Sequence, residues 1–228
     1  YINMKLYAHR GYKYKENTLK SFENSFNLFD GFEFDVRLTR DNIPIVIHDY
    51  NLKRSHNSET IIHLSNYDYL RKYKLPLLID VLKLVQKNKK YCIIDIKVKE
   101  NSKLILRFLY NLVNNKIIDS DRFYCIVYTD NIHFFTNIKV LRVYNVEISD
   151  NINMKFNGIA LKYNGLKNNI NLIKKFLNKN KKLNNHFHLN LYILDSHKQK
   201  NLNFNDFLFY LKYNYNNISF TFDKLIDL

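Results

Sequence analysis

The stretch GFEFDVRLTRDNIPIVIHD, residues 31–49, contains two strand-like runs that lie close together in the chain. Residues 32–37 alternate apolar and polar side chains, and residues 43–48 are rich in β-branched side chains. Only residues 38–42 separate the two runs, whereas a parallel crossover needs about a dozen residues or more. The sequence therefore predicts an antiparallel hairpin that turns near Asp41-Asn42.

Strand and helix patterns alternate along the rest of the chain, which favours a parallel sheet built from βα units. Thr18 can cap a helix with an apolar stripe, and similar helical patterns begin near residues 78, 102, 170 and 206. Further strands are expected at residues 5–9, 91–97, 123–128, 140–144, 158–161, 189–194 and 218–222. With residues 32–37 they give eight parallel candidates. Residues 1–228 are therefore predicted to form a single α/β domain, a (β/α)8 TIM barrel with a β-hairpin after the second strand and no large insertion domain. An open doubly wound sheet is the alternative.

Composition and charge exclude several classes of protein but identify no function. The chain is 46% hydrophobic and 25% charged, which argues against a disordered, collagenous or disulfide-rich protein. No run approaches the roughly 20 apolar residues of a membrane span, and no secretory leader is visible, so we expect no transmembrane segment and a cytoplasmic location. Cys92 and Cys125 lie in apolar strands and are expected to be buried free thiols. The net charge of +15 attracts anionic partners of any kind.

Strand periodicity places two carboxylates together. Glu33 and Asp35 share one face of the second strand, because successive side chains point to opposite faces. A hairpin turn near Asp41-Asn42 gives a pairing sum of about 83, which places His48 opposite Asp35. Two buried carboxylates need a compensating partner. That partner is either a divalent cation or an ion pair with Arg10 or Arg37.

Further polar side chains are expected at the same end of the barrel. His9 ends the first strand, and Asp95 and Lys97 share a face of the strand at residues 91–97. The carboxyl ends of barrel strands converge at one mouth, where the active sites of this fold lie. We therefore expect the polar residues of these strands to meet.

The chemistry of these side chains indicates metal-assisted cleavage of a phosphodiester. The candidate metal ligands are Glu33, Asp35 and Asp95. An all-oxygen, anionic set of ligands suits a hard cation, Mg²⁺ or Ca²⁺. His9 and His48 can act as general acid and base, although the sequence does not assign which does which. Arg10 and Lys97 supply positive charge for a phosphate.

Short motifs within residues 8–49 identify a family. They are Ala8-His9-Arg10-Gly11, Glu16-Asn17-Thr18, Gly31-Phe32-Glu33-Phe34-Asp35-Val36, Thr39-Arg40-Asp41 and Val46-Ile47-His48-Asp49. In order and spacing they resemble the signature of the glycerophosphodiester phosphodiesterases, which reads HRG, PENT, E-x-D, T-x-D and HD. Residues 75–82 and 93–97 are similar to the family's P-T-L-x-E-x-L segment and I-E-x-K strand. Beyond Tyr128 the likeness is limited to barrel periodicity.

The resemblance implies a TIM-barrel enzyme that hydrolyses a glycerophosphodiester to glycerol 3-phosphate and an alcohol, using one divalent cation. It implies His9 and His48 as the acid–base pair, and Glu16 and Asn17 as residues that steady the loop after the first strand. It also implies Arg10 and Lys97 as phosphate ligands and the three carboxylates as metal ligands. The expected partner is a small-molecule glycerophosphodiester or a lysolipid, and no nucleic acid. The oligomeric state is not indicated.

Departures from the signature leave two alternatives open. Lys15 stands in place of Pro, Asp95 in place of Glu and Asp195 in place of Thr, and the chain has no Trp to wall a glycerol pocket. Asp at the position of Asp95 is similar to the spider-toxin sphingomyelinase D group, which forms cyclic phosphates from choline lipids. One alternative is therefore a sphingomyelinase D-like or lysophospholipase D-like phosphodiesterase acting on lipids. The other is a catalytically inactive basic barrel that binds nucleic acid.

Overall fold

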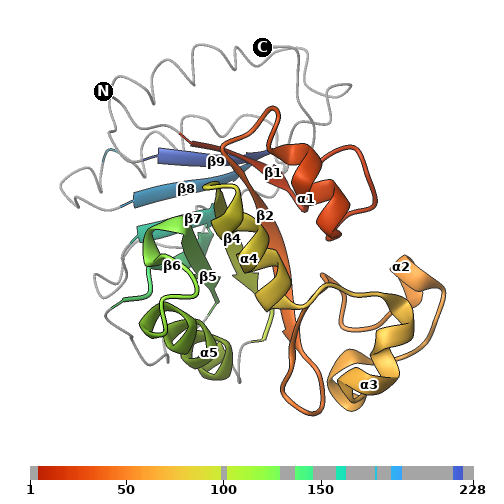
Figure 1. Cartoon of the computed structure of the whole chain (residues 1–228). Helices are drawn as coiled ribbons and strands as arrows, with labels where there is room; N and C mark the ends of the chain where they lie inside the picture. The colour runs from red at the N-terminus through yellow and green to blue at the C-terminus, as the bar shows by residue number, and fades with distance from the viewer. Residues whose placement is uncertain are drawn as a thin grey trace.

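The computed structural model is a closed barrel of parallel strands (Figure 1), and it describes residues 5–98, 102–128, 137–145, 158–162, 178, 186–191 and 218–222. The nine-stranded sheet has the order β1-β9-β8-β7-β6-β5-β4-β2-β3, and β1 also pairs with β2. Every pair around this ring is parallel, and among the strands that the structure describes only β3 pairs antiparallel, with β2. The predicted TIM barrel is confirmed. The open doubly wound sheet is wrong, because the pairing of β1 with β2 closes the eight parallel strands into a ring.

The strands mostly begin and end where their periodicity predicts. They are β1 (Lys5–His9), β2 (Gly31–Leu38), β3 (Pro44–Val46), β4 (Tyr91–Ile96), β5 (Phe123–Val127), β6 (Val140–Asn145), β7 (Gly158–Lys162), β8 (His186–Leu191) and β9 (Ile218–Phe222). The prediction for β8 is wrong by three residues, since the strand begins at His186 rather than residue 189. Its pairing with β7 starts at His186↔Gly158. Hydrogen bonding to the neighbouring strand therefore sets the start of β8, rather than the strand propensity of its own residues.

Helices cover the outer face of the barrel. Helix α1 (Leu19–Ser25) begins at the predicted cap, where Thr18 and Ser21 form a capping box. Helix α4 (Leu78–Lys87) and helix α5 (Ser102–Asn114) pack in the same outer layer (Figure 1). The Phe22 ring of α1 stacks on Phe32 of β2, with ring centroids 4.2 Å apart. The helices predicted near residues 170 and 206 lie outside the described residues.

The barrel interior contains a smaller apolar cluster. Its buried members are Tyr7, Ile93, Ile126 and Leu141, one from each of β1, β4, β5 and β6. These residues occupy the inward face at alternate positions, and in β4 the next inward residue is Asp95. Ile93 therefore lies on the N-terminal side of Asp95, whereas Ile126 of β5 is level with Asp95 in the register.

The hairpin register differs by one residue from the prediction. Val36 pairs with Val46, a sum of 82, and the residue opposite Asp35 is Ile47, which donates its N–H to the Asp35 carbonyl. Thr39 N–H donates to Ile43 O, which leaves a three-residue turn, and Asn42 in that turn is left-handed (φ 62°). An odd-numbered turn shifts the pairing, so His48 lies one residue beyond the position expected opposite Asp35.

A small lobe follows the hairpin beside the barrel (Figure 1). Its elements are α2 (Lys53–His56), η1 (Ile62–Leu64), α3 (Tyr67–Leu70) and η2 (Arg71–Tyr73). They enclose their own buried cluster of Ile45, Ile47, Leu52, Ile62 and Leu70. The insertion is short, as predicted, although the sequence did not indicate these four short helices. Among the described residues, no helix is long and apolar enough to cross a membrane.

Candidate active site

Three buried carboxylates form the centre of the site. Glu33 and Asp35 lie on the inward face of β2, and the parallel register places Asp95 of β4 directly beside Asp35. One carboxylate oxygen from each residue lies within 4.8 Å of the other two. All three residues are fully buried. The pairing of β2 with β4 therefore brings together the acidic residues that the sequence predicts as metal ligands.

The three carboxyl groups differ in their pKa. Burial, with the nearby Asp35, raises the pKa of Glu33 to about 8. Burial also raises the pKa of Asp95, even though Lys97 opposes the shift. The pKa of Asp35 is lowered, because Lys97 and Arg10 outweigh the effect of its burial. Without a cation, the cluster therefore holds an ionised Asp35 beside a carboxyl that keeps its proton near neutral pH.

Two side chains that directly follow β4 and β5 contact Asp95. Lys97 Nζ lies 2.6 Å from Asp95 Oδ2 and 3.1 Å from Asp35 Oδ1. Tyr128 donates its hydroxyl to Asp95 Oδ2 at 2.8 Å. Sequence reasoning missed Tyr128, although it is the last residue of the predicted strand and alternates with the inward-facing Ile126. Period-two counting along β5 was the signal that could have found it.

The end of β1 and the loop between β1 and α1 supply the second group of site residues. His9 Nε2 lies 3.7 Å from Glu33 Oε2, and Arg10 Nε lies 3.0 Å from Asp35 Oδ2. Asn17 donates its amide to Asp35 Oδ2 at 3.0 Å. Arg10 and Asn17 are both left-handed (φ 54° and 57°), a conformation that Asn adopts readily but that is costly for Arg. Arg10 is thus held in a strained conformation, and the loop aims the Arg10 and Asn17 side chains at Asp35.

His48 is joined to this loop by a chain of charged contacts. Its Nδ1 lies 2.7 Å from Asp49 Oδ1, and Asp49 Oδ2 accepts a hydrogen bond from Arg54 Nε at 2.6 Å. Arg54 also pairs with Glu16, which in turn pairs with Arg10 at 3.2 Å. The sequence predicted Glu16 to steady the loop but missed Asp49 and Arg54. No local pattern marks Arg54, because it lies in the small lobe.

The carboxylates have the free oxygens that a metal ion needs. Both oxygens of Glu33 and Oδ1 of Asp95 are buried and accept no hydrogen bond from any described residue. The alternative of an ion pair with Arg10 accounts for Asp35 only. Buried carboxylate oxygens are costly unless they are paired or coordinated. Oxygen-only ligands suit a hard cation, so Glu33, Asp35 and Asp95 could together hold one.

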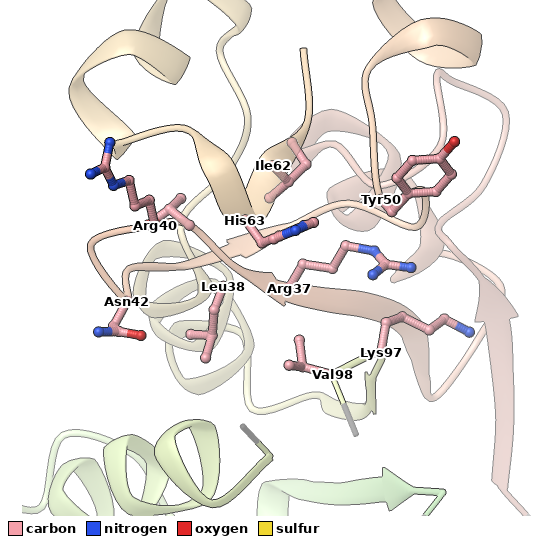
Figure 2. A pocket seen from close by; sticks show the side chains of 10 residues that line it. Arg37, Leu38, Arg40, Asn42, Tyr50, Ile62, His63, Lys97 and Val98 are labelled. Atoms are coloured by element: carbon pink, nitrogen blue, oxygen red, sulfur yellow. The ribbon is translucent and has the colours of Figure 1, made fainter. Parts of the chain in front are cut away.

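A cavity opens next to this cluster (Figure 2). Its volume is about 410 Å³, and Lys97 belongs both to its wall and to the contacts with Asp35 and Asp95. A substrate bound at the carboxylates would therefore have space on the side of Lys97.

The model of the glycerophosphoryl diester phosphodiesterase family matches residues 9–204. The chain belongs to that family. This confirms the resemblance indicated by the motifs in residues 8–49 and extends it over most of the barrel. The family match includes every predicted site residue.

Members of this family are similar to the chain in sequence, and solved phosphodiesterase structures are similar to it in fold. A glycerophosphodiester phosphodiesterase of Bacillus altitudinis is 34% identical over 113 residues, which are 42% of this chain and 46% of that protein. The chain thus spans about half the length of the curated relatives it matches. A glycerophosphodiester phosphodiesterase structure from Thermotoga maritima has a TM-score of 0.65 at 19% identity, over 96% of this chain and 95% of that one. An Oleispira antarctica phosphodiesterase, solved with sn-glycerol-3-phosphate as product, has a TM-score of 0.59 at 14% identity, over 95% and 92%.

Proposed function

We propose that this chain hydrolyses glycerophosphodiesters to glycerol 3-phosphate and an alcohol with the help of one divalent cation, Mg²⁺ or Ca²⁺. The observation that carries the proposal is the buried carboxylate cluster, with His9 and Arg10 at one side and Lys97 at another. Membership of the family supports it, as does the glycerol 3-phosphate bound to the Oleispira antarctica relative. The pairing of β1 with β9 supports treating residues 1–228 as a single catalytic domain.

Glu33, Asp35 and Asp95 are the residues proposed to hold the cation. When bound, a divalent cation polarises a phosphoryl oxygen and helps to orient the phosphodiester. Arg10 and Lys97 are proposed to bind the phosphate in addition to the carboxylates that they contact. Both side chains are only 14–15% exposed, and both border the cluster. Positive charge that is already in position stabilises the negative charge that develops on phosphorus-bound oxygen.

The two histidines are proposed to move protons. The Asp49 carboxylate favours the tautomer of His48 with hydrogen on Nδ1, which leaves Nε2 to accept a proton. This supports His48 as the general base and His9 as the acid that protonates the leaving alkoxide. The base acts on a water molecule or on the neighbouring glycerol hydroxyl, and the second route gives a cyclic phosphate first.

Release of glycerol 3-phosphate from glycerophosphocholine tests the proposal. We expect turnover with Mg²⁺ or Ca²⁺, none with a chelator, and a loss of at least about 100-fold in kcat for His48→Ala, the scale of general acid–base catalysis. His56→Ala is the matched control, since His56 contacts Lys15 on the surface. No turnover with any divalent cation would refute the proposal. Turnover of a lysolipid alone, or a cyclic phosphate as the final product, would favour the lipid-directed alternative.

A further inference from the structure

The mouth of the barrel has a layer of cations above its layer of carboxylates. Arg37 follows Asp35 by two residues on β2, and Lys97 follows Asp95 by two residues next to β4. Lys97 N–H donates to the Val36 carbonyl, which extends the strand pairing to this level. Period two therefore places Arg37 and Lys97 side by side on the inward faces, one step further toward the mouth.

These two cations face the cavity of about 410 Å³, which lies within the size range of small-molecule sites. Figure 2 shows the charged ends of Arg37 and Lys97 at the same end of the cavity, with the Tyr50 ring close by. Arg40 and His63 add to the basic wall, and no Asp or Glu is among the described residues that line it. The cavity therefore has a positive wall, although the neighbouring cluster is acidic.

The charge of Arg37 is only partly compensated by the protein. Its Nε donates to the backbone carbonyl of His48 at 2.7 Å, and its other nitrogens donate to no described residue. Burial lowers the pKa of Arg37, and the more distant Asp35 and Asp49 oppose that shift without cancelling it. A half-buried guanidinium with unused donors is a site for an anion, because charge-assisted hydrogen bonds gain strength where water is partly excluded.

We propose that this cavity binds the alcohol part of the substrate and selects alcohols that carry an additional anionic group, of the phosphate monoester type. The inference rests on the proposed function, since Lys97 connects the cavity to the carboxylates at which the diester is cleaved. The Tyr50 and Ile62 side chains offer apolar walls to a ring-shaped alcohol. A quaternary ammonium group is disfavoured there, because it would approach Arg37 and Lys97 with the same sign of charge.

Two substrates that differ by a single phosphate test the selectivity. We compare kcat/KM for the glycerophosphodiester of inositol 4-phosphate with kcat/KM for that of unphosphorylated inositol. The expected ratio is about tenfold or more in favour of the phosphorylated substrate, and it should fall to about one in Arg37→Gln. Arg37→Gln also removes the hydrogen bond to the His48 carbonyl. Any resulting disturbance of His48 lowers kcat/KM for both substrates together, so it cancels in the ratio. Lys72→Gln, which removes one exposed charge outside the cavity wall, is the matched control and should keep the ratio.

A binding measurement tests the cavity without turnover. Inositol 4-phosphate should bind at least fivefold more weakly to Arg37→Gln than to the unchanged protein by calorimetry, and Lys72→Gln should bind it as the unchanged protein does. If both substrates are cleaved with a ratio near one, the selectivity is refuted and the proposed function stands. If neither substrate is cleaved but the Arg37-dependent binding is found, the proposed function fails and the anion site stands. Equal loss in both variants would assign the effect to the diffuse charge of the protein and overturn the inference.

Discussion

Asn17 hydrogen-bonds both the side chain and the backbone of Asp35, and its replacement gives the sharpest test of how the site is built. The Asn17 amide donates to Asp35 Oδ2 at 3.0 Å, and Asn17 Oδ1 accepts the Asp35 backbone N–H at 3.4 Å. The residue is 6% exposed and has a φ of 57°. Asn is one of the few residues that adopt this left-handed conformation readily. One side chain therefore supplies the conformation of the loop and a fixed position for the carboxylate.

The cost of Asn17→Ala can be summed from these contacts. Removing a hydrogen bond to a charged group costs about 1.5–3 kcal/mol, and a left-handed Ala costs roughly 1–2 kcal/mol. We expect the free energy of unfolding to fall by about 3 kcal/mol. Asn17→Asp keeps the shape and tolerates the same φ, but it places a second carboxylate about 3 Å from Asp35.

The Asn17→Asp variant adds a dependence on pH. Like charge raises the pKa of the introduced carboxyl in the folded state, so the folded protein binds a proton that the unfolded chain has released. The loss of stability relative to the unchanged protein should therefore be smaller at pH 5 than at pH 8. Urea unfolding followed by circular dichroism in the presence of a chelator measures both variants. A loss below about 1 kcal/mol for Asn17→Ala, or no change with pH for Asn17→Asp, would refute the reasoning.

Glu33, Gly11 and Arg54 each allow a further test of this geometry. Since burial first, and then a neighbouring carboxylate, raise the pKa of Glu33 from 4.5 to about 8, the melting temperature of cation-free protein should fall as pH rises from 5 to 8. Scanning fluorimetry should find a weaker fall in Glu33→Gln. Gly11→Ala should destabilise the fold by about 2 kcal/mol or more in urea unfolding, because φ is +93° and the added Cβ would lie 2.2 Å from Ser21 Oγ. Arg54→Ala should lower kcat about tenfold, because Asp49 loses the partner that positions it beside His48. The free energy of unfolding should change by less than about 1 kcal/mol, since the ion pair is exposed. An unchanged kcat would contradict this role.

The carboxylate cluster could be predicted from the sequence because it depends only on regular strands. Period two places Glu33 and Asp35 on one face, and parallel pairing sets Asp95 beside them. The same reasoning extends to Tyr128, which the strand pattern contains. The position of His48 depends instead on the number of residues in a turn. Left-handed Asn42 adds one residue to that turn, and no periodicity reveals this.

The contacts around His48 could not be predicted for a different reason. Arg54 pairs with Glu16 across 38 residues of sequence, from a helix of only four residues. Such a short helix has too few turns to show an apolar stripe, so neither its existence nor its direction can be recognised beforehand. Its position comes from the buried cluster of the small lobe, a tertiary feature.

The charge at the barrel mouth links the proposed cation site to the proposed substrate cavity. Lys97 and Arg10 compensate Asp35, whereas burial and the nearby Asp35 raise the pKa of Glu33 to about 8. A divalent cation that binds the three carboxylates must displace the proton of Glu33, so cation affinity should rise with pH and binding should release protons near pH 7. Ionisation of Glu33 adds one negative charge to the cluster, and the divalent cation adds two positive charges. The net charge of the cluster therefore rises by one. The carboxylate cluster next to Arg37 and Lys97 is then less negative than before. Cation binding therefore strengthens the attraction of these two side chains for an anionic substrate.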